Sequence, residues 1–68
     1  MGRFRLLKPI LGVDPITRQG RILPPGTVVE VPAAPPAGNR TVDVVCNGKP
    51  TIVFVNDLFS RSEKVNAP

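Results

Sequence analysis

The side chains that could carry out acid–base chemistry are few and scattered. The five carboxylates stand on different stretches of the chain, and no two have a spacing that predicts convergence: Asp14, Glu30, Asp43, Asp57 and Glu63. The chain has no histidine, the usual residue that titrates near neutral pH. The sequence therefore predicts no catalytic residues, and we expect a protein that is not an enzyme.

The single cysteine, Cys46, offers no better candidate for a reactive group. A thiol becomes a nucleophile when a neighbouring base lowers its pKa, and histidine is absent. Its place in an alternating strand pattern predicts a small buried side chain instead. Without histidine or a second cysteine, the sequence has no set of zinc ligands at a suitable spacing. It also has no glycine-rich motif that would bind a phosphate. We therefore expect no metal and no cofactor.

Basic residues suggest one class of partner. Nine lysines and arginines outnumber the acidic residues and give a net charge of +4, which favours acidic partners. Candidates for a nucleic-acid-binding surface come from a first strand and from later loops: Arg3, Arg5, Arg18, Arg21 and Arg40. The alternative is that basic residues spread along the whole chain only keep the protein soluble.

Apolar residues on a predicted hairpin suggest a second class of partner. Val45, Ile52 and Phe54 fall on the hairpin face opposite the one that fills the core. If no other part of the chain covers them, they form an exposed apolar strip, and such strips usually mark interfaces. A tightly curved barrel that buries both hairpin faces is the alternative. A small core supplies only about 3–5 kcal/mol, so support from a partner subunit is reasonable.

The elements that position these residues are mostly short strands. At 68 residues the chain has room for one core, and we predict one domain over residues 1–65 with a frayed tail at 66–68. Alternation and β-branched residues predict strands at 3–8, 27–31, 41–46, 51–55 and 62–65. Turn residues predict a long folded-back loop or an irregular hairpin over 10–25 and one 3₁₀ turn at 56–60. Residues 32–39 contain three prolines and predict an exposed connection.

The pair Asn47-Gly48 predicts a tight hairpin between the two most apolar strands. We favour a connection of residues 47–50, because a turn of two residues would place charged residues opposite apolar ones. That connection sets Val42, Val44 and Cys46 opposite Val55, Val53 and Thr51. On the other face it sets Asp43 opposite Phe54 and Val45 opposite Ile52.

The order of these elements resembles that of SH3-like small β-barrels. The matching stretches are 3–9 (RFRLLKP), 23–27 (LPPGT) and 53–58 (VFVNDL). The resemblance implies an all-β barrel of about five strands with one 3₁₀ turn. It extends weakly to short uncharacterised phage and bacterial proteins with a similar opening strand and PPGT turn. SH3 domains that bind proline-rich peptides use tyrosine and tryptophan, which this chain lacks, so that activity is not implied.

Two functions follow as expectations. The first is a non-catalytic protein-interaction or self-assembling module, of adaptor or inhibitor type, with a protein partner or a second copy at Val45, Ile52 and Phe54. The alternative is a nucleic-acid-binding barrel that uses its basic surface. A single cysteine and the lack of a long apolar run predict a cytoplasmic protein without membrane contact. No small-molecule substrate is expected.

Overall fold

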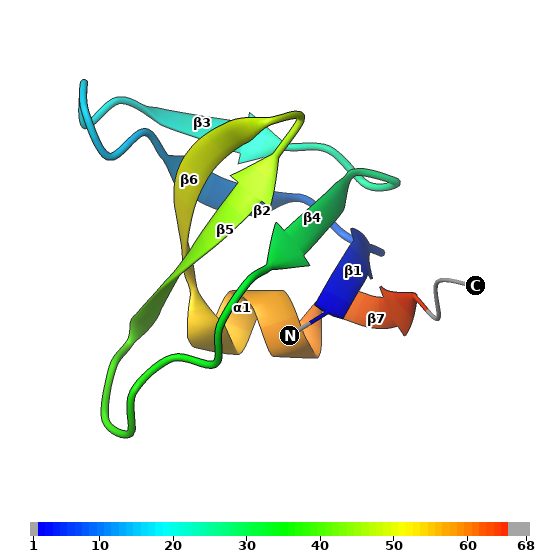
Figure 1. The fold of residues 1–68 in the computed structure, drawn as a ribbon. Helices are drawn as coiled ribbons and strands as arrows, with labels where there is room; N and C mark the ends of the chain where they lie inside the picture. The colour runs from blue at the N-terminus through cyan, green and yellow to red at the C-terminus, as the bar shows by residue number, and fades with distance from the viewer. Residues whose placement is uncertain (1, 66–68) are drawn as a thin grey trace.

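The computed structural model describes residues 2–65 and consists of one antiparallel β-sheet with one short helix (Figure 1). The predicted all-β class is confirmed. The elements in chain order are β1 (Gly2–Leu6), β2 (Ile10–Val13), β3 (Gly20–Leu23), β4 (Val28–Val31), β5 (Thr41–Cys46), β6 (Lys49–Phe54), α1 (Val55–Ser60) and β7 (Ser62–Val65). The tail predicted at 66–68 lies outside the described residues.

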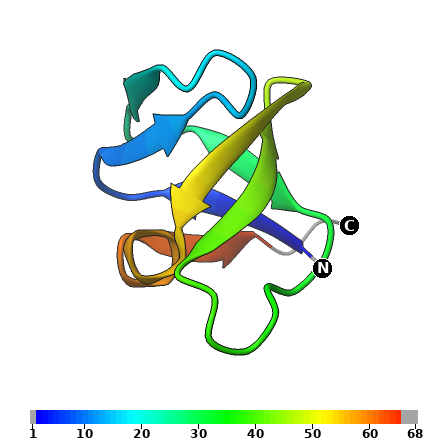
Figure 2. The same ribbon diagram turned by 90° about the vertical axis from the view of Figure 1, so that its left-hand side faces the viewer.

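The sheet has seven strands in the order β3-β2-β6-β5-β4-β1-β7. The prediction of a barrel with about five strands is therefore wrong in strand number. It is also wrong in closure, since no ladder in the described part of the chain joins the edge strands β3 and β7. The sheet still bends strongly, because β1 and β7 cross the direction of β5 and β6 (Figure 2). This bend encloses the core on the inner face.

The two additional strands lie in the segment 10–25, for which a folded-back loop or an irregular hairpin was predicted. Ile10 pairs with Leu23 and Leu11 with Ile22, so the segment is an antiparallel hairpin. The connection between the two strands is the turn at 14–19. There the Asp14 carboxylate accepts the backbone N–H groups of Ile16 at 2.8 Å and Thr17 at 3.0 Å. This Asx-type turn leaves the flanking residues free to form strands.

The hairpin of β5 and β6 closes through a turn of two residues, so the predicted longer connection is wrong. Asn47 and Gly48 both have positive φ, as a type I′ turn requires. The observed ladder pairs Val42 with Val53, Asp43 with Ile52 and Val44 with Thr51, and Val45 with Pro50. The shift relative to the expected register is two residues, which is one full strand period. Each side chain therefore keeps the face predicted for it.

The reason for preferring the longer turn does not apply to this sheet. Asp43 does lie opposite Ile52, but it is exposed on the outer face, where water solvates the carboxylate. Pro50 also fits the observed register. Cys46 and Lys49 flank the turn and form a hydrogen-bonded pair. Because hydrogen-bonded pairs alternate along the ladder, the next pair, Val45 and Pro50, is not hydrogen-bonded, so β5 needs no N–H from Pro50.

The segment predicted as a 3₁₀ turn is the α-helix α1. Its last bond runs from the backbone N–H of Arg61 to the carbonyl oxygen of Asp57 at 3.0 Å, which is the i to i−4 spacing of an α-helix. Leu58 is fully buried and anchors α1 against the sheet. The long loop at 32–40 contains no strand or helix, in agreement with the sequence prediction.

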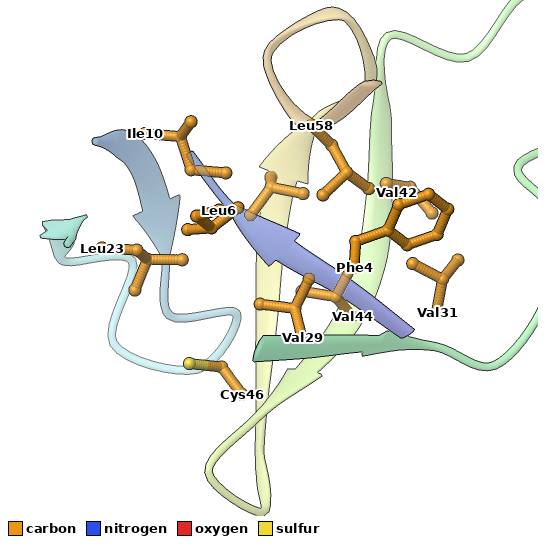
Figure 3. Close-up of a cluster of buried hydrophobic side chains, with 11 residues drawn as sticks. Phe4, Leu6, Ile10, Leu23, Val29, Val31, Val42, Val44, Cys46 and Leu58 are labelled. Carbon is orange, nitrogen blue, oxygen red and sulfur yellow. The ribbon is translucent and has the colours of Figure 1, made fainter. Parts of the chain in front are cut away.

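The core lies on the inner face of the bent sheet (Figure 3). Phe4 and Leu6 of β1 point into it, as their alternation predicts, and Phe4 meets Phe59 edge to face at 5.3 Å between ring centroids. Every strand except β7 contributes buried side chains, and α1 adds one. The buried residues are Phe4, Leu6, Ile10, Leu23, Val29, Val31, Val42, Val44, Cys46, Val53 and Leu58.

Candidate functional site: an apolar sector of the outer sheet face

The outer face of β3, β2, β6 and β5 carries a group of apolar side chains that the core does not use. We call this group the outer apolar face and define it by Leu11, Ile22, Val45, Ile52 and Phe54. Ile22 is 63% exposed, Phe54 43% and Leu11 38%, whereas Val45 and Ile52 are half-buried. These strands are neighbours in the sheet, so the side chains form one surface.

The strand register arranges this surface in rows. Leu11 pairs with Ile22 across β2 and β3, and Val13 pairs with Ile52 across β2 and β6. The next position along the second ladder places Leu11 level with Phe54. A row of Ile22, Leu11 and Phe54 therefore runs across three neighbouring strands at right angles to their direction.

The three residues predicted from the sequence do share this face. Val45 and Ile52 are diagonal neighbours rather than a directly opposed pair, because Val45 pairs with Pro50. Leu11 and Ile22 were missed as members of the face. The signal that could have found them is the matched pairs Ile10-Leu11 and Ile22-Leu23 on either side of a turn, which predict one buried and one exposed residue in each strand.

The outer face around β1 carries two ion pairs beside the exposed Val28 of β4. On β1, Arg3 meets Glu30 at 3.5 Å and Arg5 meets Glu63 at 2.8 Å, with about half of each side chain exposed. Surface pairs of this kind contribute only about 0–1 kcal/mol to stability. Their consequence here is electrostatic: each arginine already faces a carboxylate, which partly neutralises its charge. The ion pairs thus lie around β1, whereas the outer apolar face lies on β3, β2, β6 and β5.

The five arginines proposed for nucleic-acid binding do not come together. Arg3 and Arg5 lie on β1, whereas Arg21 lies on β3 near the opposite edge of the sheet. Arg18 is in the turn before β3, and Arg40 ends the long loop beside Phe54 and Asp57. The structure instead brings Arg21 together with Lys49, which sequence reasoning missed.

Arg21 and Lys49 line a small cavity of about 160 Å³ between the β2–β3 turn and the start of β6. Asp14 lines the same cavity. The backbone N–H groups of Thr17 and Ile16 lower the pKa of the Asp14 carboxyl below its ordinary value of 3.8, and the charge of Arg21 lowers it further. The carboxylate therefore stays ionised at neutral pH, and its bonds mark it as a turn-forming group.

The cysteine and the possible metal ligands can be located in the part of the chain that the structure describes. Cys46 is buried in the core, as its strand position predicts. Over residues 2–65 no three side chains of the metal-ligating types lie close enough to hold an ion. No helix in this range is long and apolar enough to span a bilayer.

No family model matches this chain, and neither the curated proteins nor the solved structures contain a match to it.

Proposed function

We propose that this protein is a non-catalytic protein-interaction or self-assembling module, of adaptor or inhibitor type, and that the outer apolar face is its interface. The observation that supports this proposal best is the row of Ile22, Leu11 and Phe54 across neighbouring strands. Isolated exposed apolar residues are common on protein surfaces, but a continuous row is typical of a surface that meets a partner.

The surface is small for a complete interface. Strands lie about 4.8 Å apart and residues on one face repeat about every 6.7 Å, so the five residues together cover about 160 Å² of the sheet. Functional patches on small proteins reach about 300–600 Å², whereas a standard interface buries about 800 Å² on each partner. The face alone therefore suits the centre of an interface, with polar neighbours such as Asp43 at its rim.

As the fold family, we propose an SH3-like fold whose sheet stays open instead of closing into a barrel, and as the setting we propose the cytoplasm. The support is the run of β4, β5 and β6, the helix α1 after β6, and the final strand β7 beside β1. The hairpin of β2 and β3 takes the place of the long loop of that fold. The cytoplasmic setting is supported by the single cysteine. The likeness to short phage and bacterial proteins stays a prediction.

Light scattering on a size-exclusion column, at low and at high salt, tests the proposed function. We expect a species heavier than one 7.3 kDa chain that persists at high salt, because apolar contacts are not screened. Phe54→Lys and Ile52→Lys should lower its mass. Leu7→Lys is the matched control, since Leu7 is 53% exposed but lies outside the apolar face.

Nucleic-acid binding is the second candidate, and the shared cavity of Arg21 and Lys49 is the observation that favours it. In that case the protein would be a single chain that holds nucleic acid at low salt and releases it at high salt. Arg21→Gln would reduce the slope of log affinity against log salt by about 1 for a DNA duplex probe. Arg3→Gln is the control, because Arg3 is paired with Glu30.

A further inference from the structure

The backbone edge of β3 is a second surface, distinct from the side chains of the outer face. The sheet is open, and its two edges are β3 and β7. Natural proteins protect such edges with charged residues or with covering segments, because unpaired backbone groups recruit further strands. The edge strand β7 carries Glu63 and Lys64. By contrast β3 has one charged residue, Arg21, and lies along the margin of the molecule (Figure 1).

The turn before β3 determines which of its backbone groups point outward. The backbone N–H of Asp14 donates to the carbonyl oxygen of Gln19 at 2.9 Å. Hydrogen-bonded pairs alternate in an antiparallel ladder, so the pair Gly12 and Arg21, two positions along, also bonds across β2 and β3. The N–H and C=O groups of Gly20 and Ile22 therefore point away from β2, toward the free edge.

We propose that two copies of this chain associate by antiparallel pairing of their β3 edges, centred on Ile22. In this register Ile22 lies opposite Ile22 of the second copy and exchanges two backbone hydrogen bonds with it. Arg21 then lies opposite Leu23 of the second copy. A register centred on Arg21 instead would place two like charges directly opposite each other, which is destabilising. The contact is the same patch on both copies, as a two-fold dimer requires.

The outer apolar face supports the choice of a second copy as the partner. Ile22 is its most exposed member and stands on the edge strand, and the Leu11 side chain leans over the same strand. A Cβ added at Gly20 would lie 3.2 Å from Leu11 Cδ1. Edge pairing therefore joins the two apolar faces into one surface of roughly 320 Å², twice that of a single chain. The inference deepens the proposed function, on which it rests, by naming the partner.

The short strand makes the association dependent on concentration. β3 contains only Gly20–Leu23, so the paired edges bury less than a standard interface. We expect the average mass at high salt to rise from near 7.3 kDa to at least twice that value as protein concentration increases from about 10 µM to about 1 mM. A mass that stays at one chain over this whole range overturns the proposed edge pairing.

Ile22→Pro tests the edge directly. Proline removes the N–H that points outward but leaves the ladder between β2 and β3 intact, and edge strands tolerate it. The variant should remain a single chain over the full concentration range. Ile22→Thr is the matched control, because it loses apolar surface but keeps the N–H, and it should retain the dimer in part. An Ile22→Pro variant that dimerises like the parent protein excludes the edge.

Two further readouts separate this inference from the proposed function. Phe54→Lys should remove species larger than two chains and leave the edge dimer, because β2 separates β6 from β3. If Phe54→Lys abolishes assembly and Ile22→Pro has no effect, the outer face is the interface and the edge is not. Amide hydrogen exchange on the unmodified protein needs no variant. The Gly20 and Ile22 amides should exchange more slowly as concentration rises, and unchanged rates contradict the pairing.

Discussion

Gly12→Ala measures how closely the β2–β3 hairpin packs onto the rest of the sheet. Gly12 is buried and pairs with Val53, so its position holds Leu11 on the outer face. An added Cβ would lie 2.9 Å from Thr51 Cγ2 and 3.1 Å from Leu23 Cδ1. Contacts this short force neighbouring atoms to move, which costs about 1–3 kcal/mol. The lower entropy of the unfolded alanine chain offsets about 0.4–1 kcal/mol of this.

The net loss of about 1–2 kcal/mol is large for a chain whose core supplies about 3–5 kcal/mol. For a domain of this size it corresponds to a fall in Tm of roughly 5–15 °C. Thermal and urea denaturation followed by circular dichroism measure it. Gly20→Ala is the control, since its nearest contact is the mobile end of Leu11 at 3.2 Å, and it should cost less.

Thr51→Ser completes a double-mutant cycle with Gly12→Ala. Serine lacks Cγ2, the atom that the new Cβ would meet, and it keeps the hydroxyl that donates to the Lys49 carbonyl oxygen. The double variant should therefore lose about 1 kcal/mol less unfolding free energy than the sum of the losses in the two single variants. A Gly12→Ala protein as stable as the parent, or strictly additive changes, would refute the close packing at this position.

Three further changes test separate parts of the fold. Leu58→Ala leaves a cavity at a fully buried site and should lower the free energy of unfolding, measured by urea denaturation, by about 2–5 kcal/mol. A loss of this size is enough to leave most molecules unfolded. Gly48→Ala places alanine at a φ of +76° and should cost about 1–2 kcal/mol, whereas an unchanged midpoint would contradict the type I′ turn. The depressed pKa of Asp14 gives stability that is present above pH 3.8 and lost as pH falls further; Asp14→Asn should remove this dependence, and an NMR titration of Asp14 at its ordinary value would contradict it.

Alternation within single strands is the part of the fold that could be predicted from the sequence. Phe4, Leu6, Val42, Val44 and Cys46 are buried because side chains in a strand alternate between two faces, and that property is local. Register is not local. The observed turn of Asn47 and Gly48 moves every pair by two residues, and the pattern of apolar residues is the same before and after such a shift.

The strands β2 and β3 were not assigned from the sequence, which left a folded-back loop or an irregular hairpin open for 10–25, because their stability comes from elsewhere in the chain. Ile10 and Leu23 are buried against the rest of the core, and only the bent sheet provides that environment. The same omission limited the candidate site. Without β2 and β3, the sequence pointed to Val45, Ile52 and Phe54 alone and left out the two exposed residues, Leu11 and Ile22, that extend the face to the sheet edge.

The molar mass at high salt of the unmodified protein, beside Phe54→Lys and Leu7→Lys, tests most directly whether the outer apolar face is an interface. We predict that the unmodified protein and Leu7→Lys share a species heavier than one 7.3 kDa chain, and that Phe54→Lys lowers its mass. A single chain that carries nucleic acid at low salt and releases it at high salt would contradict the proposed interface and favour nucleic-acid binding at Arg21 and Lys49.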